Sequence, residues 1–115
     1  MQFVEFSYFT KWVVENLKDD EYQKIQEDLI KNPRKGDIIP HGHGLRKLRW
    51  RFKDKGKSGG VRVIYYYWTA DNEVYMLYLY AKNEQADLDA AGLKAAKKFV
   101  EQLKHAKEKR GKDRQ

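Results

Sequence analysis

Cysteine is absent from the sequence, and only two of its 115 residues are proline. Without cysteine, the chain cannot have a disulfide framework, a thiol nucleophile or a zinc site with cysteine ligands. The absence also fits a reducing compartment, so we expect the protein in the cytoplasm. Both prolines fall within residues 33–44, together with glycines and histidines, and this composition predicts an irregular loop there.

Long hydrophobic runs are also missing. A membrane span needs about 18 or more apolar residues in succession, and no window approaches that length. The N-terminus lacks a basic leader followed by an apolar run, so we expect a soluble, unprocessed chain. Its length suits a single domain, which we place at residues 1–108, followed by a basic, frayed tail at 109–115.

Positive charge is concentrated in one segment, residues 45–62. This segment holds eight basic residues and one acidic residue, so its net charge equals the formal net charge of the whole chain, +7. The basic residues are Arg46, Lys47, Arg49, Arg51, Lys53, Lys55, Lys57 and Arg62. A concentrated basic segment of this kind is typical of a protein that binds a polyanion.

The N-terminal third shows one short strand and two helices. Residues 2–6 are β-prone and are followed by Ser7, which can cap a helix over about 8–17. Asp20 and Gln23 resemble a capping box that opens a second helix, and the residue before Pro33 ends it. The apolar face of the second helix is predicted to contain Tyr22, Ile25, Leu29 and Ile30.

The basic segment begins with a strand whose residues alternate. Leu48 and Trp50 mark the side facing the core, which leaves Lys47, Arg49 and Arg51 together on the other side. Two interpretations remain open for these cations. They contact a nucleic acid backbone, or they form a solvated face that prevents edge pairing.

Two further strands complete the predicted sheet. Residues 61–68 are almost entirely β-branched and aromatic, as expected of a central strand covered on both faces, and residues 74–82 are of the same type. With the basic strand they form an antiparallel meander, which residues 2–6 are expected to join.

A helix follows the last strand. It is predicted to be capped by Asp87 or Asp89 and to carry the apolar stripe Leu93, Ala96, Val100 and Leu103. From Lys104 onward the chain is expected to be a charged tail, either frayed or contributing to RNA binding.

His41 and His43 lie two residues apart among glycines. Such a pair suits metal ligation or proton transfer, but the sequence suggests no third ligand nearby, and an ordinary loop is the remaining alternative. We predict no metal and no cofactor.

Three motifs together resemble one protein family: G-L-R-K-L-R-W, G-K-S-G-G-V-R-V-I-Y-Y-Y-W and L-Y-L-Y-A-K-N-E-Q-A-D-L. They are similar to toxins of bacterial type II toxin–antitoxin pairs in the RelE/ParE superfamily, and within it to the HigB branch. The resemblance implies an α+β fold of order β-α-α-β-β-β-α. In this fold a twisted, mostly antiparallel sheet has two N-terminal helices packed on one face and a C-terminal helix.

The resemblance further implies a ribosome-dependent endoribonuclease that cuts messenger RNA in the decoding site and so inhibits translation. Carried over by motif, the residues around the scissile phosphate are Lys47, Arg49, Arg62, Lys82 and Asn83. This chain departs from the best-known family pattern after Asn83, where it has Asp87, Leu88 and Asp89 in place of the family's arginine and tyrosine.

The expected reaction is metal-independent attack of an RNA 2′-hydroxyl on the adjacent phosphate. Arg62 suits the phosphorane, because guanidinium is permanently charged and its fork fits phosphate oxygens. Lys47 is a candidate base, and Arg49 and Lys82 are candidate phosphate clamps. Glu84 is a candidate acid or base, with a surface carboxylate as the alternative.

Other residues are expected to bind RNA without reacting. Arg46, Arg51, Lys53, Lys55 and Lys57 are predicted to contact the phosphate backbone. Tyr66 and Tyr80 are the candidates for base stacking.

The resemblance implies several partners: the ribosome, messenger RNA and a cognate HigA-like helix-turn-helix antitoxin. Operator DNA is expected to be bound only through the antitoxin. Two other functions stay open, namely a non-enzymatic toxin of the same fold that inhibits DNA gyrase and a non-toxic nucleic-acid-binding module. DNA damage with intact messenger RNA would indicate the gyrase inhibitor. RNA binding without cleavage would indicate the non-toxic binding module.

Overall fold

A computed structural model describes the backbone of residues 1–51, 60–81 and 88–113, with side chains as far as Arg110. Three helices and five strands are present in these residues. The helices are α1 (Ser7–Asn16), α2 (Asp19–Lys31) and α3 (Ala90–Asp113). The strands are β1 (Gln2–Glu5), β2 (Asp37–Ile38), β3 (Arg46–Arg51), β4 (Gly60–Trp68) and β5 (Glu73–Ala81).

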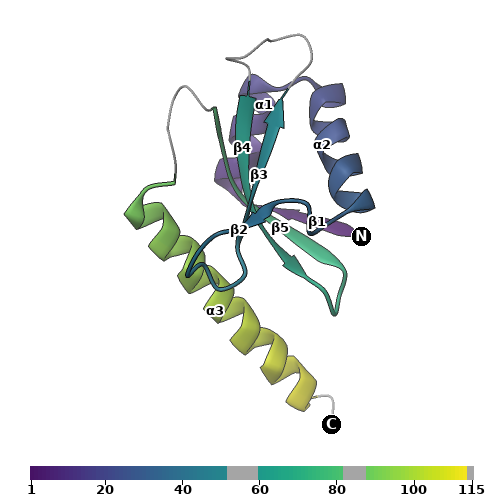
Figure 1. Cartoon of the computed structure of the whole chain (residues 1–115). Coiled ribbons are helices and arrows are strands. Elements are labelled where there is room, and N and C mark those ends of the chain that lie inside the picture. Colours follow the sequence, from purple (N-terminus) through teal and green to yellow (C-terminus); the bar gives the residue numbers. More distant parts are fainter. Residues whose placement is uncertain (52–59, 82–87, 114–115) are drawn as a thin grey trace.

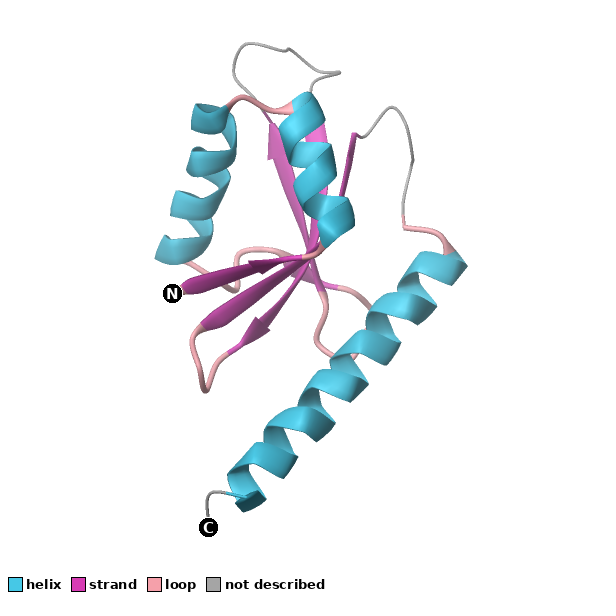
Figure 2. Ribbon diagram, turned by 180° about the vertical axis from the view of Figure 1, so that it is seen from behind, coloured by secondary structure: helices cyan, strands magenta, loops and turns pink. Residues whose placement is uncertain are grey.

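The strands form one sheet in the order β1-β5-β4-β3-β2, with β1 parallel to β5 and the other neighbours antiparallel. Helices α1 and α2 pack on one face of the sheet and α3 on the other. In Figure 1, α1 lies behind the strands and α3 runs diagonally below and to the left of them. The reverse view in Figure 2 shows α1 and α2 side by side in front of the strands. This is the predicted α+β fold, and the order of the main elements is confirmed.

Strand β4 lies between two hydrophobic cores, as its unbroken apolar sequence predicts. Val63 and Tyr65 pack with residues of α1 and α2, among them Phe9 and Ile25. The alternate β4 residues, such as Ile64, point to the other face and pack with residues of α3. The molecule is therefore a sheet with helices on both faces.

A β-bulge changes which residues of β5 face α3. Val63 pairs with Leu79 and Ile64 with Tyr78, but Tyr65 pairs with Met76, so Leu77 is the extra residue. One added residue reverses the alternation of a strand. As a result Leu77 and Tyr80, three positions apart, both pack on the α3 side.

Both N-terminal helices begin differently from the prediction. Ser7 is the first residue of α1, so the N-cap position belongs to Phe6, which forms no side-chain capping hydrogen bond. Helix α2 begins at Asp19, because the carboxylate of Glu21 accepts a hydrogen bond of 2.9 Å from the backbone N–H of Lys18. The end of α2 is confirmed, since Asn32 before the proline is extended.

Two further differences concern the apolar face of α2 and the length of α3. Ile30 is 53% exposed and does not belong to the core face of α2. The helix α3 continues through the segment expected as a charged tail, as far as Asp113. Its start is as predicted, because the Asp89 carboxylate accepts a hydrogen bond of 2.7 Å from the backbone N–H of Gly92.

Lys107 ties the far end of α3 to the turn between β4 and β5. Its ammonium donates hydrogen bonds to the carboxylates of Asp71 and Glu73, at 2.6 Å for Glu73, and lies 5.9 Å from the ring centre of Trp68. The hydrogen bonds to the two carboxylates raise the pKa of Lys107. This contact explains why a segment rich in charge is held as a helix against the sheet.

None of the helices in the described residues combines the length and apolar character that crossing a membrane requires.

Candidate nucleic-acid interface

The pairing of β3, β4 and β5 places cationic and tyrosine side chains in one row. Arg49 is directly opposite Arg62, and Arg62 is directly opposite Tyr80. Directly opposite residues in antiparallel strands project from the same face of the sheet. Two residues before Arg49, Lys47 is opposite Ile64, which packs on the α3 side. Lys47, Arg49, Arg62 and Tyr80 therefore share the face that α3 crosses.

The pairing of Arg49 with Arg62 is electrostatically unfavourable for an isolated protein. Like charges directly opposite each other across two strands destabilise a sheet. In the part of the chain that the structure describes, Arg49 pairs with the carboxylate of Asp37 at 3.9 Å, and both side chains are largely exposed. Within the described residues no carboxylate forms an ion pair with Arg62, whose guanidinium lies 3.4 Å from the carbonyl oxygen of Val61. A bound anion would neutralise the repulsion, so this pair indicates a polyanion site.

The other cations of β3 divide between the two faces. Arg46 projects to the opposite side, where its guanidinium donates hydrogen bonds to the carbonyl oxygens of Arg34 (3.1 Å) and Gly36 (2.8 Å). Arg46 therefore stabilises the loop before β2 and does not belong to the row of cations. Arg51 is exposed at the end of β3, opposite Gly60, and continues the row.

The two tyrosines predicted to stack on bases are both buried. Tyr80 is 5% exposed and adjoins Arg62, whereas Tyr66 is 7% exposed and lies four residues farther along β4. Burial raises the pKa of the Tyr66 hydroxyl. The ring of Tyr66 also lies against Gly44, whose φ of 99° suits glycine and where a Cβ atom would approach within 3.0 Å of the ring. Only Tyr80 of the two is brought beside the cations.

Six predicted site residues lie outside the described residues, so the structure does not place them. They are Lys53, Lys55, Lys57, Lys82, Asn83 and Glu84. Five of the predicted site residues, Lys47, Arg49, Arg51, Arg62 and Tyr80, are brought together by the sheet.

Asp37 beside Arg49 was not expected from the sequence. It belongs to β2, a strand of only two residues in a stretch that the composition predicts to be irregular. Its position opposite Lys47 places an acid at the border of the cationic row. Two residues are too few for an alternating pattern, so the sequence carries no signal for this contact.

The two loop histidines have unusual backbone conformations. His41 and His43 have φ values of 58° and 57°, in the left-handed region. The described residues contain no group of three or more histidine and carboxylate side chains able to hold a metal ion. Nε2 of His43 lies 3.6 Å from the carboxylate of Glu101 on α3.

The fold and this face define a small α+β protein that presents a cationic sheet surface to a polyanion. The sequence of residues 1–112 matches the family model described as the RelE toxin of the RelE / RelB toxin-antitoxin system. The chain belongs to this toxin family. The resemblance seen in the three motifs is thus confirmed at the level of the family, and the HigB branch stays a prediction.

Proposed function

We propose that this toxin is a ribosome-dependent endoribonuclease of the HigB branch, acting in the cytoplasm on messenger RNA in the decoding site. The observation that carries the proposal is the directly opposed pair Arg49 and Arg62 beside Lys47 on one face of the sheet. RelE family membership supports the toxin class, and the geometry supports a phosphodiester as the group that is bound.

The proposed reaction is attack of a 2′-hydroxyl on its neighbouring phosphate, which leaves a 2′,3′-cyclic phosphate and a 5′-hydroxyl. Arg62 stabilises the charge that develops on the phosphorane, because its fork can donate two parallel hydrogen bonds to phosphate oxygens. Arg49, directly opposite, binds the same or the adjacent phosphate. Lys47 is the proposed acceptor of the 2′-hydroxyl proton, since it lies two residues, about 6.6 Å along the strand, from Arg49, and water protonates the departing 5′-oxygen.

In this proposal the ribosome aligns the RNA for the reaction. Among the described residues, Arg49 of the cationic row is largely exposed, and such a surface does not by itself fix the conformation of an RNA strand. Alignment of the attacking hydroxyl with the phosphate supplies a large part of the rate in reactions of this type. We propose that the decoding site supplies that alignment and that the toxin supplies the charges.

The test is to express the wild-type chain and Arg62→Ala in bacteria and to map the 5′ ends of messenger RNA. We expect growth arrest with new 5′-hydroxyl ends for the wild type. Loss of one preorganised charge donor costs about 10²- to 10³-fold in rate, so Arg62→Ala should remove the new ends. Lys24→Ala is the matched control, since Lys24 is exposed on α2, on the other face of the sheet.

Two outcomes would contradict the proposal. Growth arrest with intact messages and with DNA damage would indicate gyrase as the target. Message cleavage that persists in Arg62→Ala, with Lys24→Ala unchanged, would exclude the proposed role of the arginine pair.

A cognate antitoxin follows from the family, whose description names a toxin–antitoxin system. We propose a HigA-like helix-turn-helix protein that covers the cationic row or the N-terminal helices and that carries the toxin to operator DNA. Competition between the antitoxin and a labelled RNA for the wild-type chain distinguishes the two surfaces, because only an antitoxin on the cationic row should displace RNA.

A further inference from the structure

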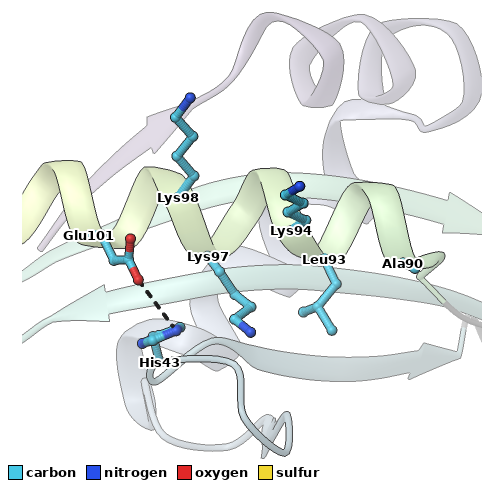
Figure 3. Close-up of a pocket in the computed structure, with 7 residues that line it drawn as sticks. All are labelled: His43, Ala90, Leu93, Lys94, Lys97, Lys98 and Glu101. Atoms are coloured by element: carbon cyan, nitrogen blue, oxygen red, sulfur yellow. Dashed lines mark ion pairs between the residues drawn. The ribbon is translucent and has the colours of Figure 1, made fainter.

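A hollow of about 510 Å³ lies between α3 and the loop that precedes β3. It is lined by His43 from the loop and by residues of α3: Ala90, Leu93, Lys94, Lys97, Lys98 and Glu101. Figure 3 shows Lys97 extending from α3 on the same side as His43, whose ring approaches the carboxylate of Glu101. The hollow is open to solvent and large enough for a phosphate with its sugar.

The charges around the hollow do not compensate one another. Three lysines and one acid line it, and within the described residues no ion pair holds Lys94, Lys97 or Lys98. Figure 3 shows Lys98 extending away from His43, so Lys97 is the lysine on the side of the loop. Lys94 is three residues from Lys97 and four from Lys98, spacings at which like charges on a helix repel each other. An anion bound in the hollow would remove this repulsion.

The loop of residues 41–44, which forms the other wall of the hollow, has a strained backbone. His41 and His43 both occupy the left-handed region that glycine adopts without strain. The loop already contains Gly42 and Gly44 for its tight turn. The left-handed conformation at position 43 directs an imidazole toward Glu101, so a side chain able to donate a hydrogen bond borders the hollow.

The hollow adjoins the proposed phosphate site. Helix α3 and the cations of β3 lie on the same face of the sheet, and His43 precedes Lys47 by only four residues. Their Cα atoms are therefore at most about 14 Å apart, since a chain extends by no more than about 3.6 Å per residue. A single strand of RNA bound at Arg49 and Arg62 needs only a few nucleotides to reach the hollow. This continuity favours RNA over an acidic protein segment as its occupant.

We propose that the hollow between α3 and the loop of residues 41–44 is a second binding site for an RNA phosphate, separate from the phosphate that is cleaved. Lys97 and His43 bind the phosphate, and Lys94 and Lys98 add positive charge. The carboxylate of Glu101 repels the phosphate and competes with it for His43, so Glu101 weakens binding. The inference rests on the proposed action on RNA, and it assigns to α3 a binding role in addition to its role in the core. The phosphate belongs either to the message or to ribosomal RNA.

The test uses a short, fluorescently labelled single-stranded RNA with 2′-O-methyl groups, which cannot be cleaved by 2′-hydroxyl attack. For the triple variant Lys94→Gln, Lys97→Gln and Lys98→Gln, we expect affinity to fall about tenfold, which corresponds to about 1.4 kcal/mol. The slope of log K against log salt should become shallower by about 0.7 for each phosphate that the variant no longer neutralises. Lys24→Gln on α2 is the matched control and should bind as the wild type does.

Glu101→Gln gives a prediction of opposite sign. Glu101 is the one acid among the described residues that line the hollow, and its removal should tighten RNA binding by about two- to fivefold, the range of an exposed charge pair. Glu15→Gln, an exposed acid on α1, measures the general effect of removing one negative charge. The gain from Glu101→Gln should disappear when Lys97→Gln is also present, because the two side chains then no longer share a ligand.

Purified ribosomes and a poly-glutamate peptide complete the test. Weaker binding of the triple variant to the RNA oligonucleotide assigns the phosphate to the message. Unchanged oligonucleotide binding with weaker ribosome binding assigns it to ribosomal RNA, and both results support the inference. Wild-type affinity for both RNAs, or a loss confined to poly-glutamate, overturns it. These assays measure no cleavage, so a wild-type chain that binds through the hollow but leaves messages intact would contradict only the proposed function.

Discussion

Arg46 and Arg49 lie on the same short strand but have different tasks. Arg46 holds two carbonyl oxygens of the preceding loop, whereas Arg49 faces Arg62 across the strands. Their difference follows from the period of two in a strand, which sends residues three positions apart to opposite faces. The net charge of the strand therefore overstates its charge toward RNA.

We expect substitutions of these two arginines to separate stability from RNA binding. Arg46→Gln should lower the free energy of unfolding by about 1–2 kcal/mol, because two hydrogen bonds of a charged donor are removed. Arg49→Gln should leave stability within about 0.5 kcal/mol and weaken RNA binding about tenfold. Urea denaturation and fluorescence anisotropy with the 2′-O-methyl RNA measure the two effects. If Arg46→Gln weakened RNA binding as much as Arg49→Gln in the folded protein, the assignment of faces would be wrong.

Tyr65 performs a comparable structural task inside the core. Its hydroxyl donates a hydrogen bond to the carbonyl oxygen of Pro33 (2.8 Å) and accepts one from the backbone N–H of Gly36 (2.9 Å). Gly36 itself has to be glycine, since a Cβ atom there would lie 2.8 Å from the Tyr65 ring. The loop after α2 is thus fixed to the central strand, and β2 follows directly from it.

We expect Tyr65→Phe to lower the free energy of unfolding by about 1–3 kcal/mol, because it leaves the buried N–H of Gly36 without a partner. Tyr67→Phe is the matched control on the same strand. The hydroxyl of Tyr67 forms an exposed hydrogen bond of 3.3 Å with Asn72, so this change should cost less than about 0.5 kcal/mol. Equal losses in urea denaturation for the two variants would contradict this account.

At the scale of elements, α3 depends on both an apolar stripe and one charged contact. The stripe was predictable, because Leu93, Ala96, Val100 and Leu103 recur at helical spacing and all pack on the sheet. The contact of Lys107 with Asp71 and Glu73 joins segments more than thirty residues apart. No local pattern in the sequence records such a contact.

We expect Lys107→Met to destabilise the protein by about 1–2 kcal/mol in thermal or urea unfolding, since two carboxylates lose a shared donor. Lys109→Met, an exposed position two residues later on α3, should change stability by less than about 0.5 kcal/mol. Hydrogen exchange should also show faster opening of the last turns of α3 in Lys107→Met alone. Unchanged exchange there would mean that the apolar stripe suffices to hold the helix.

The strands show where sequence patterns succeed and where they fail. The apolar runs of β4 and β5 identified both strands within one or two residues, because long buried strands have a strong signal. The bulge at Leu77 left no trace in the sequence, yet it decides that Tyr80 lies beside Arg62. The start of α2 was missed for a related reason, since the hydrogen bond that fixes it comes from Glu21 and not from the expected pair of Asp20 and Gln23.

For the whole molecule, the excess of positive charge in residues 45–62 predicted the cationic face, since alternation along β3 put Lys47 and Arg49 on one side. The sequence did not predict the hollow on α3. Its two walls are far apart in the chain, and only the folding of α3 across the sheet brings Lys97 near His43. Three lysines spaced three and four residues apart were the available signal.

Buried and half-buried tyrosines of the two hydrophobic cores predict how the stability of the whole protein responds to alkaline pH. Burial is the main cause that raises the pKa of five hydroxyl groups, and carboxylates near some of them add to it. The five are Tyr22, Tyr65, Tyr66, Tyr75 and Tyr78. In the unfolded chain a tyrosine ionises near pH 10, whereas in the native protein these five keep their protons to higher pH.

The sign of the effect follows from proton binding. Above about pH 10 the native state binds more protons than the unfolded state, so the free energy of unfolding falls as the pH rises. Below about pH 9 the tyrosines are neutral in both states, and their contribution to stability should be constant. We expect urea midpoints that are level between about pH 8 and 9 and that fall steeply above about pH 10. Tyrosinate absorbance should rise at higher pH in the native protein than in the urea-unfolded protein, and coincident titration curves would show that these hydroxyls are open to solvent.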